Sequence, residues 1–202
     1  MQTEIVFAGF GGQGALFAGQ IMAFTGMDAG LAVTWMPSYG PEMRGGTANC
    51  QVIISDEEIG SPLTRTPLAA VIMNLPSLDK FEDRIAPGGV MIVNSSLVNR
   101  QPTRTDVDWL MIPAQEIAES LGNRRLLNMV MLGALLQKLP VISIEALEKG
   151  LDVHLPERHR KFLKPNIEAI RQGAAFARGE LTVEATPGAN GHEPEVIPPT
   201  SV

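Results

Sequence analysis

The sequence is short of the residues that metal and disulfide chemistry require. Its 202 residues include one cysteine, Cys50, and three histidines. One thiol excludes an internal disulfide and cannot supply the four ligands of an iron–sulfur cluster or a structural zinc site. His154 and His159 are five residues apart, which does not place them on one helix face, and His192 lies in a polar tail. We expect Cys50 to be a small buried strand residue and the chain to bind no metal.

Long apolar runs and an excess of positive charge are also missing. No apolar stretch approaches the roughly 20 residues of a bilayer-spanning helix, and no basic leader precedes the first apolar run. The formal net charge is −6 and the pI is about 5.1, whereas affinity for nucleic acid depends on clustered lysine and arginine. We therefore expect a cytoplasmic protein that binds neither membrane nor nucleic acid.

Short apolar runs alternate with helical patterns along the chain. Alternating strands and helices predict an α/β fold, a Rossmann-like doubly wound and mainly parallel sheet with C-terminal helices. The polar turn SDEEIGSP adds a predicted hairpin insertion. Strands are predicted at 4–8, 32–36, 47–54, 69–74, 89–94 and 107–112. Helices are predicted at 14–27, within 77–85 with Ser77 as its cap, from Pro113 to Gly122, at 123–139 and at roughly 157–178.

The helix predicted at 123–139 is apolar on nearly every side. It carries Gly133 in its middle and one central polar residue, Asn128. A helix that is apolar all round must be covered all round, so it either passes through the core or packs one face on another subunit. The chain length suits one domain, predicted at 1–180. The segment 181–202 is rich in proline and glycine and is expected to be disordered or bound to a partner.

A glycine-rich loop separates the first predicted strand from the first predicted helix. Residues 9–14, Gly-Phe-Gly-Gly-Gln-Gly, satisfy the pattern G-x-G-x-x-G. Glycine lets the backbone come close to a ligand, and a helix N-terminus offers N–H groups to an anion. The alternative is that these glycines only allow tight packing of the helix on the strand. A dinucleotide site also needs an acidic residue about 20 positions later, where this chain has Trp35 to Ser38. The loop therefore suits an anion but does not suit NAD in the usual way.

A second loop, PSYGPEMRGGTANC, occupies residues 37–50. Its prolines and glycines constrain its path, and at the carboxyl edge of a doubly wound sheet it is expected to face the first loop. Arg44, beside Gly45 and Gly46, can present a planar guanidinium group to a phosphate or carboxylate. The alternative is a surface turn in which Glu42 and Arg44 pair with each other.

Three motifs in fixed order resemble the gamma subunits of the 2-oxoacid:ferredoxin (acceptor) oxidoreductases. They are the loop at 9–14, the stretch SYGPEMRGG at 38–46 and VIISDEEIGSP at 52–62. The family includes enzymes for pyruvate, branched-chain 2-oxoacids, 2-oxoglutarate and indolepyruvate. The similarity runs from about residue 3 to residue 178 and includes PGG at 87–89 and NMVMLGALL at 128–136.

The resemblance implies oxidative decarboxylation of a 2-oxoacid to an acyl-CoA, with electrons passing to ferredoxin. It also implies partners, the alpha-, beta- and delta-type subunits, which carry thiamine diphosphate, Mg and [4Fe-4S] clusters. The residues agree, because one cysteine cannot ligate a cluster and no G-D-G followed by paired asparagines is present. We expect no catalytic residue in this chain and no activity from the chain alone.

The two loops are the expected ligand-binding or docking surface. CoA is the candidate ligand, because its phosphates match loops suited to an anion; contact with the thiamine-bearing subunit is the alternative. The candidate residues are Gly9, Gly11, Gly12, Gln13, Gly14, Ser38, Tyr39, Gly40, Glu42, Arg44, Gly45 and Gly46.

Two other functions are compatible with single features of the sequence. One is a self-sufficient NAD(P)-binding Rossmann dehydrogenase, which the missing ribose acid disfavours. The other is a non-catalytic nucleotide-sensing module that pairs through the apolar helix at 123–139.

Overall fold

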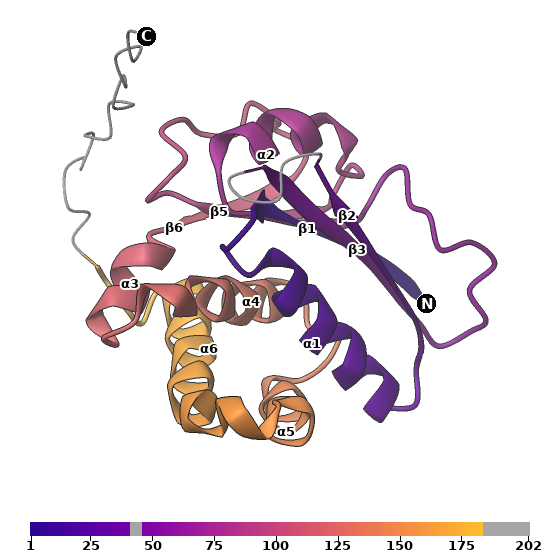
Figure 1. Ribbon diagram of the computed structural model, residues 1–202. Helices are drawn as coiled ribbons and strands as arrows, with labels where there is room; N and C mark the ends of the chain where they lie inside the picture. Colours follow the sequence, from indigo (N-terminus) through magenta and orange to yellow (C-terminus); the bar gives the residue numbers. More distant parts are fainter. Residues whose placement is uncertain (41–45, 184–202) are drawn as a thin grey trace, which may run out of the picture.

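A six-stranded sheet runs through the protein (Figure 1). The computed structural model describes residues 1–40 and 46–183. The strand order is β2-β3-β1-β4-β5-β6; β1, β4, β5 and β6 pair in parallel, and β3 is antiparallel to β1 and β2. The strands are β1 (Gln2–Phe10), β2 (Ala32–Tyr39), β3 (Thr47–Ser55), β4 (Ala69–Ile72), β5 (Val90–Asn94) and β6 (Asp108–Ile112).

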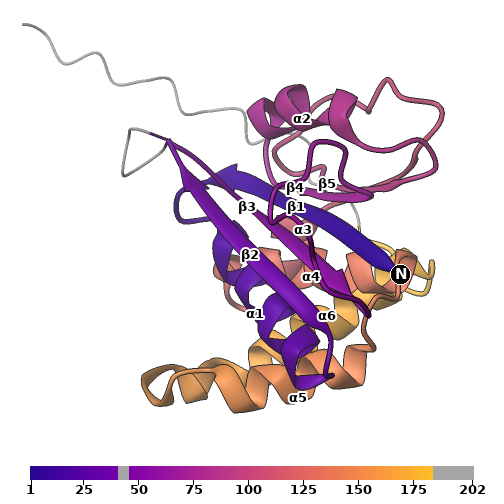
Figure 2. The ribbon, with the colours of Figure 1, turned by 90° about the vertical axis from the view of Figure 1, so that its right-hand side faces the viewer.

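Helices cover both faces of the sheet (Figures 1 and 2). Residues of β1 alternate between the two sides: Ile5 and Phe7 join the larger core with most of the helices, whereas Val6 and Ala8 join a smaller core with α2. This arrangement confirms the predicted α/β fold with a mainly parallel sheet. The helices are α1 (Ala15–Asp28), α2 (Leu75–Phe81), α3 (Ala114–Ser120), α4 (Leu127–Lys138), α5 (Ile144–His154) and α6 (Leu163–Ala177), with short 3₁₀ turns at Glu82–Arg84, Arg124–Leu126 and Glu157–Phe162.

The hairpin has a different position from the one predicted. It is formed by β2 and β3 around the second loop, where Gly40 N donates to Thr47 O at 2.7 Å. The segment SDEEIGSP instead leads away from β3, because β4 pairs in parallel with the opposite edge of β1. All four residues of β4 are buried, and a strand that is apolar on both faces belongs at the centre of a sheet.

The helices also differ from the predictions in three places. The helix predicted within 77–85 begins at Leu75, and its cap is Asn74, whose side-chain oxygen accepts from Ser77 N at 2.9 Å. The helix α5 was missed, although Ser143 caps it by accepting from Ala146 N. The last helix begins at Leu163 after a 3₁₀ turn. Pro165 lacks the N–H that would continue a regular helix back toward residue 161.

The apolar helix α4 passes through the core. This confirms the first of the two alternatives given for the helix predicted at 123–139. Every residue from Leu127 to Leu136 is buried. It crosses α6 at close range through two glycines: a Cβ added to Gly133 would lie 2.0 Å from Ile170 O, and one added to Gly173 would lie 1.8 Å from Val130 O. The two backbones therefore touch where neither residue has a side chain.

The single thiol belongs to the larger core. Cys50 is fully buried on β3, and burial raises its pKa to about 12. A neutral buried thiol is a poor nucleophile, so the prediction of a buried structural residue is confirmed.

Within the described residues, none of the helices has the length and apolar character of a membrane span.

The glycine crossing of α4 and α6 generates a stability prediction. Gly133→Ala and Gly173→Ala should each lower the free energy of unfolding by about 3 kcal/mol, because the added methyl group overlaps a backbone carbonyl. Urea unfolding followed by circular dichroism measures this. Gly60→Ala is the matched control, since its Cβ would meet no atom within 4 Å. Equal stability of all three variants would contradict the crossing.

Candidate functional site

The first glycine loop forms a tight turn between β1 and α1. Gly12 and Gly14 adopt left-handed conformations, with φ of 98° and 80°, which favour glycine. Gln13 N donates to Phe10 O at 3.1 Å and closes the turn. An added Cβ at Gly12 would meet nothing within 4 Å, so the backbone at this position is bare.

Side-chain amides of the turn itself and of distant segments hold its shape. Gln13 folds back so that its Oε1 accepts from Phe10 N at 2.6 Å and from Asn74 Nδ2 at 3.0 Å. Asn128 of α4 donates through Nδ2 to Gly14 O at 3.1 Å. Both amides sit where a side chain would collide: a Cβ on Gly9 would be 2.6 Å from Gln13 Oε1, and one on Gly14 would be 2.5 Å from Asn128 Nδ2. Gly9 and Gly14 therefore serve packing, while Gly12 leaves open backbone.

The turn lies at the carboxyl edge of the parallel strands. Met73 O, just after β4, accepts from Gln13 Nε2 at 3.4 Å and from Asn94 Nδ2, at the end of β5, at 3.3 Å. Side chains after three strands thus converge at one edge. Open α/β sheets bind their ligands at this edge.

The second loop is attached to the first by a backbone hydrogen bond. Gly11 N donates to Gly46 O at 3.0 Å, which brings the two predicted loops together. Ser38 and Tyr39 end β2, and the Tyr39 side chain is 73% exposed. The candidate residues Glu42, Arg44 and Gly45 lie outside the described residues.

The sheet topology adds a reason against a dinucleotide site. In such a site the second strand lies beside the first and its acidic end reaches the ribose. Here β3 lies between β1 and β2, and the end of β2 carries Ser38 and Tyr39 rather than an acid. The NAD alternative therefore lacks both the residue and the strand placement.

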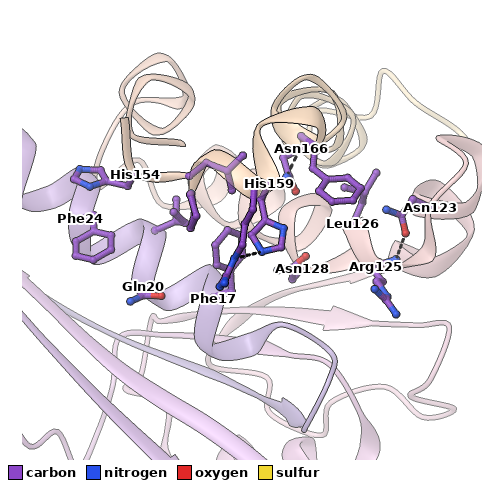
Figure 3. A pocket seen from close by; sticks show the side chains of 15 residues that line it. Phe17, Gln20, Phe24, Asn123, Arg125, Leu126, Asn128, His154, His159 and Asn166 are labelled. Atoms are coloured by element: carbon purple, nitrogen blue, oxygen red, sulfur yellow. Dashed lines mark hydrogen bonds between the residues drawn. The ribbon is translucent and has the colours of Figure 1, made fainter. Parts of the chain in front are cut away.

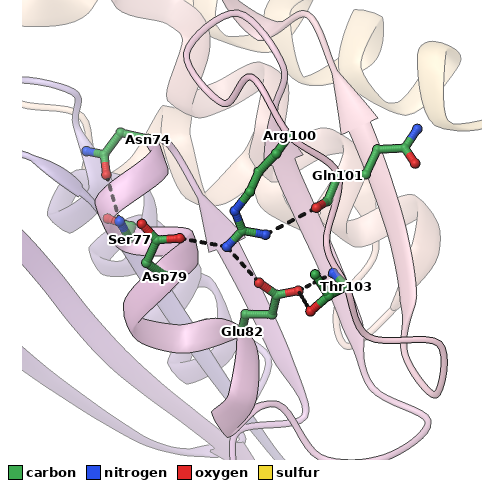
Figure 4. A network of polar contacts seen from close by, with 7 residues as sticks. All are labelled: Asn74, Ser77, Asp79, Glu82, Arg100, Gln101 and Thr103. Atoms are coloured by element: carbon green, nitrogen blue, oxygen red, sulfur yellow. Dashed lines mark hydrogen bonds and ion pairs between the residues drawn. The ribbon is translucent and has the colours of Figure 1, made fainter.

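The only buried charged residue within the described ranges, Glu82, is fully engaged (Figure 4). It accepts from Thr103 through N and Oγ1 and from Arg100 Nη2 at 2.9 Å, and Arg100 also contacts Asp79 at 2.6 Å. Burial alone would raise the pKa of Glu82, but these hydrogen bonds outweigh burial and lower its pKa. Glu82 ties the β5–β6 connection to the region of α2 and is not placed to act as an acid or base.

Two amides near the turn, Asn74 and Asn94, were not predicted, whereas Gln13 was a candidate and Asn128 was noted as the polar residue of the apolar helix. Asn74 and Asn94 follow or end buried apolar strands. A polar residue at such a position needs a partner when it is buried. That signal could have drawn attention to both, although it does not identify the partner.

The sequence and the fold of this chain both match those of known proteins. Residues 4–176 match the family model described as pyruvate ferredoxin/flavodoxin oxidoreductase. The chain belongs to this family. The resemblance to its gamma subunits is confirmed, because a solved gamma subunit of a keto/oxoacid ferredoxin oxidoreductase from Geobacter sulfurreducens superposes with a TM-score of 0.75 at 32% identity. The superposition covers 88% of this chain and 99% of that subunit.

Other family members match this chain over very different shares of their own length. The 2-oxoglutarate synthase subunit KorC of Methanocaldococcus jannaschii is 37% identical, over 88% of this chain and 95% of that protein. The ketoisovalerate oxidoreductase subunit VorA of Methanothermobacter thermautotrophicus is 35% identical, but this chain spans only 38% of it. The 2-oxoglutarate:ferredoxin oxidoreductase of Magnetococcus marinus, solved with 2-oxoglutarate, coenzyme A and succinyl-CoA, has a TM-score of 0.79 at 28% identity, over 92% of this chain and 32% of that one. This family fold therefore occurs both as a separate polypeptide and as part of longer ones.

The amide support of the glycine turn can be tested directly. Gln13→Leu should lower the free energy of unfolding by about 1–3 kcal/mol, because Phe10 N–H and the Asn74 amide lose their acceptor. Hydrogen exchange of the Phe10 amide should become faster. Gln101→Leu, at an exposed position, is the control and should change neither measurement. An unchanged Phe10 exchange rate in Gln13→Leu would refute this role of Gln13.

The anchor at Glu82 predicts a loss of stability in acid. The pKa of Glu82 is lowered from 4.5 in the folded protein, so its contribution is complete above the unfolded pKa and disappears as pH falls toward the folded pKa. Glu82→Gln should therefore be less stable at neutral pH and should lose less stability than the natural chain below pH ~4.5. Thermal unfolding across this range measures the effect. Glu58→Gln, at an exposed site, should keep the natural pH profile; a steep acid loss in Glu82→Gln would disprove the assignment.

Proposed function

We propose that this chain is the gamma-type subunit of a multi-subunit 2-oxoacid:ferredoxin oxidoreductase. The complex carries out CoA-dependent oxidative decarboxylation of a 2-oxoacid to an acyl-CoA and passes electrons to ferredoxin in the cytoplasm. The observation that carries this proposal is the match over nearly the whole length of separate polypeptides, KorC and the Geobacter gamma subunit. Both of those proteins are named as subunits, and the matches cover 95% and 99% of their lengths.

The chain contributes docking surface and part of the CoA site, and its partners supply the redox chemistry. Its one thiol and its one buried carboxylate within the described residues are both engaged in the fold, and no described group of three His, Cys, Asp or Glu residues is suited to a metal. Thiamine diphosphate, Mg and [4Fe-4S] clusters are therefore assigned to the alpha-, beta- and delta-type partners.

The open backbone at the glycine turn supports a CoA contact. Gly12 has no neighbour within 4 Å of an added Cβ, and Gly14 begins α1 without a capping side chain. Phosphate groups are favoured beside unpaired N–H groups at such a position. The Magnetococcus relative was solved with coenzyme A, which is the ligand proposed here.

The nucleotide-sensing alternative depended on pairing through the apolar helix. That helix, α4, is buried within its own chain, so its apolar faces are already covered.

We place the domain at 1–180. Leu181 and Val183, just beyond this bound, also pack on the larger core. The rest of the predicted tail, from residue 184, lies outside the described residues.

Co-expression with its companion subunits tests the proposal. The chain should co-purify in stoichiometric amount with a thiamine-diphosphate subunit and a ferredoxin-like subunit. In that complex, Arg44→Ala should leave assembly intact and raise KM for CoA about tenfold, because a guanidinium–phosphate contact is lost.

Two results would count against these assignments. Failure to co-purify with any thiamine-diphosphate subunit would overturn the gamma-subunit assignment. An unchanged KM for CoA in Arg44→Ala would show that Arg44 is not a CoA contact. Arg65→Ala, in the β3–β4 connection, is the matched control for the change in charge.

A further inference from the structure

Hollows lie on both faces of the sheet. A cleft of about 760 Å³ lies on the face that carries most of the helices, among α1, the start of α4 and the start of α6 (Figure 3). A smaller pocket of about 280 Å³ lies on the opposite face, between the β2–β3 hairpin and the segment that runs from α2 into the next 3₁₀ turn. On this face α2 packs on β1 and β4, and β2 and β3 extend beyond it (Figure 2). The pocket therefore lies in the corner between a helix and an uncovered part of the sheet.

A buried amide without a protein partner lines this pocket. Asn49 of β3 is only 7% exposed, yet its side chain makes no hydrogen bond with a described residue. Its cross-strand neighbours are the small residues Ser38 and Ala8, which leave space beside the amide. Burying an amide without a hydrogen bond costs free energy. A polar ligand in the pocket would supply the missing partner.

The next residue on the same face of β3 also has a hydrogen-bond donor to spare. Gln51 accepts from Thr64 N through its Oε1 at 3.2 Å, and its Nε2 has no partner among the described residues. Asn49 and Gln51 both line the pocket, as does the exposed Ser38. The sheet side of the pocket therefore presents N–H and O–H donors to a ligand.

The helix side of the pocket is positively charged. Lys80 Nζ and Arg84 Cζ lie 5.1 and 5.6 Å from the ring centroid of Phe81, a contact that positions both cations without neutralising them. Nearby Arg100 and Arg104 form ion pairs, whereas Lys80 and Arg84 form none with a described residue. None of the described lining residues is acidic, although the whole chain has a net charge of −6. Two cations in such surroundings favour a ligand with two negative charges.

The rest of the wall is apolar and the space is small. Met36, Pro37 and Leu63 line it, and Leu63 is 67% exposed. Pockets for drug-sized ligands have volumes of roughly 300–1,000 Å³, so this pocket suits a ligand of only a few carbon atoms. Apolar side chains beside cations and amides favour an organic anion over an inorganic one.

We propose that this pocket binds a small dicarboxylate. One carboxylate contacts Lys80 and Arg84, the other accepts from the amides of Asn49 and Gln51, and the carbon atoms between them lie beside the apolar wall. Every group in this site belongs to the described part of the chain, so the site does not depend on the gamma-subunit assignment.

Titration of the isotopically labelled full-length chain, followed by NMR, tests the site. Malonate is the probe, and the side-chain NH₂ signals of Asn49 and Gln51 should shift to saturation. Malonamide, which has the same shape without charge, should not shift them. Lys80→Gln and Arg84→Gln should each weaken malonate binding about tenfold, the loss expected for one charged hydrogen bond. Both residues are exposed, so these variants should fold, and the exposed Lys164→Gln is the control for the change in charge.

Acetate and sulfate distinguish the kind of anion. Weaker binding of both than of malonate supports a dicarboxylate, whereas equal binding of sulfate and malonate overturns that assignment. Asn49→Leu should also weaken malonate binding, with Gln51 as the reporter.

Two results would overturn the site itself. They are unshifted Asn49 and Gln51 signals, and equal malonate affinity in the natural chain and both cation variants. Malonate binding by a chain that does not assemble with companion subunits would keep the site and remove only the gamma-subunit assignment.

Discussion

The proposed site depends on a glycine turn that is held in shape by the amide of its own Gln13 and by amides of Asn74 and Asn128 from outside it. Gln13 reaches back to Phe10 and across to Asn74, and Asn128 holds the carbonyl of Gly14. Each contact requires the absence of a side chain on Gly9 or Gly14. The shape of the turn is thus held by contacts with the end of β4 and with α4.

The position of α4 is in turn set by its crossing with α6. Gly133 and Gly173 let the two helix backbones touch, and this contact lies on the same helix that carries Asn128 to the turn. A change of a few ångströms at the crossing would move the amide away from Gly14. The packing of α4 on α6 therefore affects the geometry at the carboxyl edge of the sheet.

Most strands and helices could be predicted from local patterns, because continuous apolar runs such as β4 and β5 belong in a buried parallel sheet. The hairpin was misplaced because turn-forming residues do not say which strand will pair next: β4 adds to the far side of β1. The cap of α2 was assigned to Ser77 instead of Asn74, three residues earlier. The helix α5 was overlooked although it carries a serine cap.

The two loops of the site could be proposed from sequence. Which of their glycines pack against a side chain and which leave the backbone open could not. It depends on contacts between residues more than 60 positions apart, such as Gln13 with Asn74 and Gly14 with Asn128. The cleft between α1, α4 and the start of α6 is likewise assembled from three distant segments. No local pattern encodes such a surface, whereas the ordered motifs did identify the family.

Under the proposed function, this chain shapes a binding site and its partners supply the redox chemistry. The most direct measurement is 2-oxoacid- and CoA-dependent reduction of ferredoxin, compared between the purified chain and its reconstituted complex. The account predicts no turnover by the chain alone and restored turnover in the complex. Turnover by the isolated chain would contradict it.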